Sequence, residues 1–189
     1  MTHTPDPGIK LGRKLKLDLH THCQEAARFA PVSVRQVEKI VDIVKSRGLD
    51  GIATTDHWNR EYGEEIKAIA DRYFPGEMIV IPGQEIDIGD AHQVVELYLP
   101  DGSTFRFFVH PGAPRAWVDT PENIHGIEID NAIHNWHIAK HRVLEVAAEL
   151  DLITLRNSDA HYFEDIGRYY NEISIEELCH RARRDGKIS

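Results

Sequence analysis

The sequence has little cysteine, no long apolar run and a shortage of positive charge. Its two cysteines, Cys23 and Cys179, do not make the disulfide framework of a small secreted domain. Hydrophobic residues make up 41% of the chain, but no window is apolar for long enough to span a membrane. The 22 lysines and arginines against 31 acidic residues give a net charge of −9, which argues against a large nucleic-acid footprint.

The start of the chain is polar and rich in proline, and it lacks the apolar core of a signal peptide. We therefore expect a loose tail over residues 1–14 and a cytoplasmic protein. The rest shows no internal repeat, low-complexity run or linker, and a length of 189 residues suits one domain with a real core. Residues 15–189 are therefore predicted to form that single domain.

A pair of histidines lies at the end of the first predicted strand. Leu15, Leu17 and Leu19 alternate with polar residues, which is the period-2 pattern of a strand. His20 and His22 are two residues apart, so on a strand they point to the same side and can reach one ion together. The leucines are expected to point the other way, onto a covering layer of helices.

Short strands alternate with helices along the rest of the chain. The predicted strands after the first are 49–55, 78–81, 92–99, 105–109, 126–130 and 152–156. The predicted helices are 34–47 and 175–184, each opened by a capping box, together with 61–73, a short one from Thr120-Pro121, and 133–150. Seven or eight strands with interleaved helices indicate an α/β barrel.

Side chains that bind metals recur where the predicted strands end. They are His20, His22, His57, Glu85, His110, Asp159 and His161. The carboxyl ends of the strands of a parallel barrel share one face, so we expect these side chains to converge there. Imidazole together with carboxylate suits zinc, iron or manganese. The number of ligands exceeds one tetrahedral site, so one carboxylate bridging two ions is the simplest arrangement.

Six strings in order along the chain resemble the polymerase and histidinol phosphatase (PHP) superfamily. They are Asp18-Leu19-His20-Thr21-His22, Gly51-Ile52-Ala53-Thr54-Thr55-Asp56-His57, Pro82-Gly83-Gln84-Glu85-Ile86, Val109-His110-Pro111-Gly112, Ile127-Glu128-Ile129-Asp130-Asn131 and Ser158-Asp159-Ala160-His161. The resemblance covers nearly the whole chain after the tail. It implies a distorted (β/α)7 barrel that holds two or three divalent metal ions and hydrolyses phosphoesters.

The resemblance also implies a role for each ligand. The ligands of the first ion would be His20, His22, Glu85 and Asp159. Glu85 would bridge to a second ion held by His110 and His92, and a third ion would be bound by His57 and His161. The residues expected to take part directly in catalysis are His57, Glu85, His110 and His161.

The chain departs from the family pattern after the histidine pair. The family usually continues with Ser-Asp-Gly, whose aspartate helps to hold the third ion, whereas this chain has Cys23-Gln24-Glu25-Ala26. We expect Glu25 to take the place of that aspartate. Without a third ion, His57 or His161 would instead protonate the leaving oxygen.

Several further residues are candidates for supporting roles. Glu128 and Asn131 match a family string at the edge of the site and are expected to orient ligands. Trp58 follows His57 and would form a wall of the pocket or stack on a substrate, while Arg115 and Arg168 would hold a phosphate.

Three more histidines occur in the segment predicted to form the long helix 133–150. His134, His137 and His141 share roughly one helical face by their spacing. This arrangement resembles a metal site, but we interpret it as the polar surface of the helix.

The sequence therefore predicts a metal-dependent phosphoesterase. Its partner would be a small phosphorylated metabolite and not a membrane or a long nucleic acid, and a hydroxide on or between the metals would attack phosphorus without a serine or cysteine nucleophile. Two alternatives stay open. One is a catalytically inactive metal-binding domain with a structural or partner-binding role. The other is a barrel hydrolase that acts on a C–N or lactone bond.

Overall fold

Eight strands form one mixed sheet in the computed structural model, which describes residues 12–89, 92–113, 117 and 119–183. The strands are β1 (Leu15–Asp18), β2 (Gly51–Thr54), β3 (Ile79–Asp87), β4 (Gln93–Tyr98), β5 (Thr104–Phe108), β6 (Gly126–Asn131), β7 (Ile153–Asn157) and β8 (Asn171–Ile173). Their spatial order is β7-β6-β5-β4-β3-β2-β1-β8. The pairs β3–β4, β4–β5 and β1–β8 are antiparallel, and the other neighbours are parallel. The predicted tail lies mostly outside the described residues.

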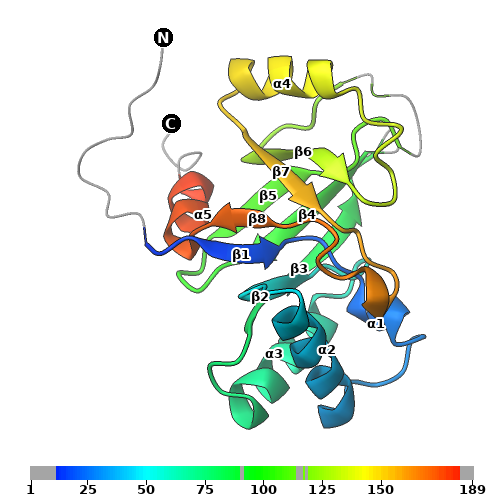
Figure 1. Cartoon of the computed structure of the whole chain (residues 1–189). Helices are drawn as coiled ribbons and strands as arrows, with labels where there is room; N and C mark the ends of the chain where they lie inside the picture. The colour runs from blue at the N-terminus through cyan, green and yellow to red at the C-terminus, as the bar shows by residue number, and fades with distance from the viewer. Residues whose placement is uncertain (1–11, 90–91, 114–116, 118, 184–189) are drawn as a thin grey trace.

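The sheet curls into a nearly closed barrel, which confirms the predicted α/β barrel (Figure 1). Strands β7 and β8 meet through a side chain. The Nδ2 atom of Asn171 donates to the Arg156 carbonyl at 3.0 Å, and its Oδ1 accepts from the Arg156 amide at 2.9 Å. The resemblance implies seven strands. The eighth is the three-residue β8, which closes the gap between β7 and β1.

Helices cover the barrel on two sides and at one end (Figure 1). The helices are α1 (Cys23–Ala26), α2 (Val34–Ser46), α3 (Arg60–Tyr73), α4 (Lys140–Glu149) and α5 (Ile175–Ala182), with one 3₁₀ turn at Phe163–Asp165. The side chains of Ser33 and Ser174 cap α2 and α5 as predicted, by accepting from the amides of Gln36 and Glu177. No helix in the described part of the chain combines the length and the apolar character needed to cross a bilayer.

The apolar core has an inner part, to which most strands contribute, and outer parts under the helices. The inner cluster includes Leu17, Leu19 and Phe107 and is completed by α5. The outer clusters lie under α2 and α3 and under α4. The expectation that the leucines of β1 face a layer of helices is therefore wrong. They point into the barrel, because a barrel of short strands needs apolar residues to fill its interior.

Strand β3 is longer than predicted, and Glu85 lies within it. Residues 82–87 stay extended because they pair antiparallel with β4 in the register Glu85↔Val95. Pro82 is accommodated beside Thr54 of β2. The string that contains Glu85 was expected to follow the strand. It forms the last part of the strand instead.

Two helix predictions are wrong. The helix predicted over 133–150 begins only at Lys140, because the Asn131 side chain accepts from the amides of Ile133 and His134 and holds the intervening segment in turns. The short helix predicted from Thr120-Pro121 is absent from residues 119–125, where Asn123 takes a left-handed conformation with φ of 55°.

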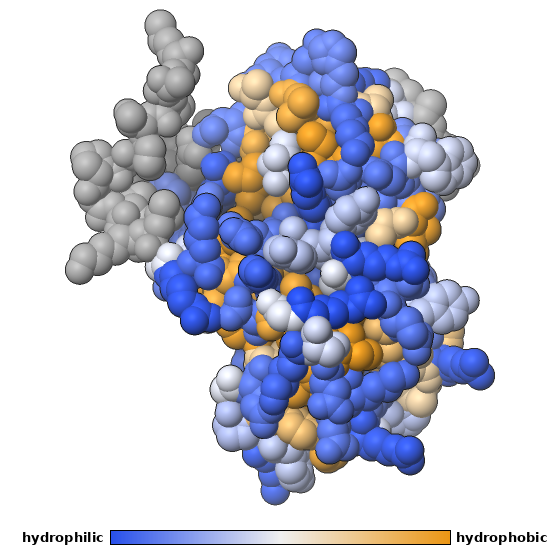
Figure 2. Space-filling view, in the orientation of Figure 1, coloured by the Kyte–Doolittle hydropathy of each residue, from blue (hydrophilic) through white to orange (hydrophobic). Residues whose placement is uncertain are grey.

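The face of the molecule seen in Figure 1 is mostly hydrophilic, with its hydrophobic residues in separate patches (Figure 2). The four most exposed large apolar side chains in the described part of the chain are all aromatic: Trp136, Phe29, Tyr162 and Trp58. Trp58 and Tyr162 each directly follow a histidine that the sequence predicts to bind metal. Both rings are exposed to solvent and do not belong to the core.

Candidate metal centre

Five buried side chains converge at the carboxyl ends of the strands. They are His20, His22, Glu85, His110 and Asp159, all with an exposure of 4% or less. Glu85 belongs to β3, and the other four lie just after β1, β5 and β7. The sequence predicts all five as metal ligands, and the structure places them together.

His20 and His22 point their ring nitrogens at one another and at two carboxylates. Their Nε2 atoms are 3.1 Å apart. The Nε2 atom of His22 lies 3.3 Å from Glu85 Oε2 and 3.2 Å from Asp159 Oδ1. The corresponding distances from His20 Nε2 to these two carboxylates are 3.6 and 3.5 Å. The donor atoms therefore face a shared centre.

These separations match the spacing of ligands around a metal ion. Donor atoms at about 2.0–2.1 Å from a tetrahedral zinc ion are about 3.3 Å from one another. Asp159 Oδ1 is buried and makes no hydrogen bond, although three histidine nitrogens surround it at 3.2–3.6 Å. Imidazole and carboxylate donors with an unbonded oxygen between them fit a divalent ion of zinc, manganese or iron.

Glu85 connects the deep part of the cluster to its outer part. Its Oε1 lies 3.0 Å from His110 Nε2, while its Oε2 lies 3.2 Å from His57 Nδ1 and 3.3 Å from His22 Nε2. Its backbone amide is held by the carbonyl of Thr55, which fixes β3 against the segment that carries His57. A carboxylate whose two oxygens face different histidines has the geometry of a bridge between two ions.

The cluster carries buried negative charge. Burial alone raises the pKa of the Glu85 and Asp159 carboxyl groups, but the facing histidines, His20 first, outweigh it and hold both pKa values well below their usual range. Burial acts to lower the pKa of His20, yet Asp159, Glu128 and Glu85 raise it well above the usual value. Both carboxylates are thus ionised, and they face the histidines across the centre of the cluster.

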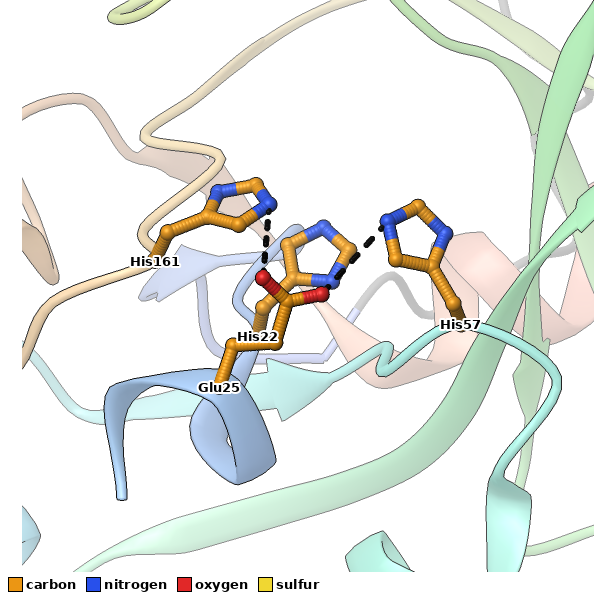
Figure 3. Close-up of side chains that lie close together, drawn as sticks. All are labelled: His22, Glu25, His57 and His161. Atoms are coloured by element: carbon orange, nitrogen blue, oxygen red, sulfur yellow. Dashed lines mark ion pairs between the residues drawn. The ribbon is translucent and has the colours of Figure 1, made fainter. Parts of the chain in front are cut away.

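A second group of side chains lies at the solvent side of the cluster (Figure 3). It consists of His22, Glu25, His57 and His161. The carboxylate of Glu25 points between two histidines, with Oε1 at 3.8 Å from His57 Nε2 and Oε2 at 3.6 Å from His161 Nε2. Helix α1, which the sequence analysis did not predict, carries Glu25 to this place. The residues expected to hold a third ion thus lie around one point.

Glu128 and Asn131, which the sequence predicts to orient ligands, form hydrogen bonds with residues of the cluster. Glu128 Oε1 lies 3.0 Å from His20 Nδ1, and its Oε2 accepts from the His110 amide at 2.7 Å. Asn131 Nδ2 donates to Glu128 at 3.0 Å and to Asp159 at 3.2 Å. Contacts of this kind fix the orientation of a ligand ring or carboxylate.

The backbone is strained at this site. Non-glycine residues in the left-handed region include His110 (φ of 27°), Asp159 (φ of 53°) and Trp58 (φ of 52°). Such conformations persist where the surrounding structure enforces them, and they gather at functional sites. Two of these three residues, His110 and Asp159, also belong to the buried cluster.

Other predicted site residues lie apart from the cluster. The ring of His92 packs against Phe108 at 5.3 Å, and its buried Nε2 atom has no hydrogen-bond partner among the described residues. Neither His92 nor His134 belongs to the groups of possible metal ligands that the described residues form. Trp58 is exposed and its Nε1 donates to Asp87 at 3.4 Å. Arg168 forms an ion pair of 2.9 Å with Asp165. Arg115 lies outside the described residues.

His134 lies at the site although we had interpreted it as part of a helix surface. Its ring is 4.9 Å from that of His110, and its Nε2 is 3.8 Å from Asp159 Oδ2. It follows the end of β6 by three residues, so the strand-end rule that found the other ligands could also have found it.

Comparisons with known proteins support the fold. A family model described as PHP-associated matches residues 137–185. The sequence matches no curated protein.

Three solved structures share the fold. PsfC from Pseudomonas syringae has a TM-score of 0.63 at 15% identity, over 88% of both chains. A "putative metal-dependent phosphoesterase" from Bifidobacterium adolescentis has a TM-score of 0.62 at 12% identity, over 88% of this chain and 95% of its own. An amidohydrolase from Chromobacterium violaceum, with bound sulfate and no metal, has a TM-score of 0.59 at 14% identity, over 87% and 96%. The chain therefore shares its fold with these structures, and its C-terminal part is similar to the PHP-associated family.

Proposed function

We propose that the protein is a metal-dependent phosphoesterase that hydrolyses a phosphomonoester of a small molecule. The observation that carries this proposal is the position of Glu85, whose two carboxylate oxygens lie 3.0–3.3 Å from His110, His57 and His22. Two ions bridged by one carboxylate are a common arrangement for phosphoryl hydrolysis.

The cluster offers a set of ligands for each of three ions. The first set is His20, His22, Glu85 and Asp159, the second is centred on Glu85 and His110, and the third is His57, His161 and Glu25. Bound divalent ions lower the pKa of water and neutralise the charge on phosphoryl oxygens. They would also add a local charge of about +4 to +6 to an acidic protein, which favours an anionic substrate.

The residues of the third set are better placed as ligands than as a proton donor to the leaving group. Glu25 directs one oxygen to His57 and the other to His161, which are half-buried side chains on two different loops (Figure 3). A carboxylate between two imidazoles completes an ion site. We therefore assign His57 and His161 to a third ion.

The protein supplies no cysteine nucleophile at the site. Cys23 directly follows His22 and is fully buried. Burial raises the pKa of its thiol far above the usual value, so the thiol stays protonated. Activated water is then the attacking group. A small substrate is favoured because the net charge of −9 repels a long nucleic-acid backbone.

The test is release of phosphate by metal-loaded protein. The substrates are an aryl phosphate and a panel of sugar, nucleotide and amino-alcohol phosphates, each with manganese, zinc or iron. We expect the metal-loaded wild-type protein to release phosphate. A chelator should abolish this activity, and the Glu85→Gln variant should lack it. Glu145→Gln on α4 is the matched control, because Glu145 is exposed and lies near His141 on the surface of the helix, and it should keep full activity. Wild-type activity no higher than that of Glu85→Gln on every ester, with metals shown to be bound, would overturn the proposal.

A second candidate reaction is hydrolysis of a C–N or lactone bond. The similarity in fold to an amidohydrolase favours it. The same metal-loaded protein is therefore assayed on amide and lactone substrates. Turnover of those substrates alone would replace the phosphoesterase proposal, and turnover of neither class would favour an inactive metal-binding domain.

A further inference from the structure

Strand β4 gives no histidine to the ion that Glu85 and His110 would share. Glu85 pairs in register with Val95, so the β4 side chain beside the carboxylate is a valine of the inner cluster. Side chains alternate along a strand, and Val94 packs with Phe108 in the outer cluster under α4. The ring of His92 also contacts Phe108, on that outer side.

The turn after β6 brings a different histidine to the same place. The ring of His134 lies 4.9 Å from the ring of His110, and His134 Nε2 lies 3.8 Å from Asp159 Oδ2. The side chain is 34% exposed, so it approaches the cluster from the solvent side.

Asn131 fixes this turn to the cluster. Its Oδ1 accepts from the amides of Ile133 at 3.0 Å and His134 at 2.9 Å. Its Nδ2 donates to Glu128 and Asp159. One side chain thus positions both the loop that carries His134 and the carboxylates that His134 faces.

Gly112 allows the turn to come close to His110. A Cβ atom at Gly112 would lie 2.7 Å from the carbonyl oxygen of His137, and the φ of Gly112 is +105°. Both features require glycine. The segment after His110 therefore lies in close contact with the segment that carries His134, and a glycine is needed where the two meet.

We propose that His134, in place of His92, is the second histidine of the ion held by Glu85 and His110. Two imidazoles and one carboxylate form a donor set suited to zinc, manganese or iron. This inference rests on the metal-binding part of the proposed function and does not depend on which bond is hydrolysed.

The test is the metal content of variants after equilibrium dialysis against manganese or zinc, measured by elemental analysis. His134→Ala should lose one ion per chain and keep the others. His92→Ala, and His141→Ala on the exposed surface of α4, should keep the wild-type count. His134→Gly with added imidazole should recover the lost ion, because imidazole restores the missing donor without repairing a structural defect. Circular dichroism checks that the variants fold.

A full metal count in His134→Ala, or loss of an ion from His92→Ala alone, would overturn this inference. Wild-type protein that binds fewer than two ions would instead contradict the proposed function itself, so the two failures are distinguishable.

A second variant tests the position of the turn. Gly112→Ala should weaken binding of the same ion by about 10- to 100-fold, as expected when a residue that positions a ligand is changed. Gly102→Ala is the matched control, because Gly102 also has a positive φ (+83°) but nothing within 4 Å of its Cβ position. Equal metal affinity in the two variants would show that the close approach of the turn does not support the ion.

Discussion

At the scale of the residue, the proposed metal centre depends on side chains that each contact more than one partner. Glu85 faces histidines from three segments, Glu128 contacts His20 and the His110 amide, and Asn131 holds both Glu128 and Asp159. Removing one such side chain affects several ligands at once. The effects of substitutions at these residues are therefore expected not to add when the substitutions are combined.

The first prediction concerns Glu85 and His110. His110→Ala and Glu85→Ala should each lower the rate of ester hydrolysis by orders of magnitude, because each disables the same pair of ions. The double variant should be about as slow as the slower single variant. Rates of phosphate release under saturating metal measure this. Losses that multiply in the double variant would show that the two residues act separately.

The second prediction concerns Glu25. Glu25→Ala should remove one ion and leave the rest, because the Glu25 carboxylate lies between His57 and His161, the outer histidines of the cluster. Elemental analysis measures the count, and Glu38→Ala on the exposed face of α2 is the control. If Glu25→Ala keeps the wild-type metal count and rate, Glu25 has no role in the site.

At the scale of the element, short-range patterns predicted the elements that are long or capped. The capping boxes at Ser33 and Ser174 located α2 and α5, and the alternation of leucines located β1. The predicted strands 49–55 and 152–156 lie near β2 and β7. The elements α1 and β8 were missed because three or four residues carry too little periodicity. The start of α4 was misplaced because the side chain of Asn131 competes for the backbone amides after β6.

The third prediction concerns the seam of the barrel. Asn171→Ala should destabilise the fold by about 2–4 kcal/mol, since its side chain forms four hydrogen bonds, two with Arg156 and one each with Asn157 and the Leu17 carbonyl, at about 0.5–1 kcal/mol per bond. Urea unfolding of the metal-free protein measures the change. Glu172→Ala at the neighbouring exposed position should be close to neutral. Equal midpoints for the two variants would show that the seam does not depend on this side chain.

At the scale of the whole molecule, the barrel brings distant segments to one edge. The sequence predicted that metal-type residues after several strands would meet, because parallel strand ends share a face, and five of them do meet in the buried cluster. It predicted His92 as the second histidine of the second ion, whereas we propose His134. The proposal depends on the antiparallel register that pairs Glu85 with Val95 and on the turn that carries His134, neither of which has a local signature.

The fourth prediction is that metal binding and folding are coupled. The cluster joins segments that follow or belong to β1, β3, β5 and β7, so bound ions would hold these parts of the barrel together. A chelator should lower the melting temperature, and added metal should restore it. Calorimetry with and without the chelator measures this effect. An unchanged melting temperature would mean that the ions do not contribute to the stability of the fold.

The central claim is that Glu85 bridges two ions, and metal content tests it most directly. Elemental analysis of metal-loaded wild-type protein should give at least two divalent ions per chain. Glu85→Ala should lose more than one of them, because both ions share its carboxylate, while Glu145→Ala should lose none. A fully loaded Glu85→Ala variant, folded by circular dichroism, would contradict the account.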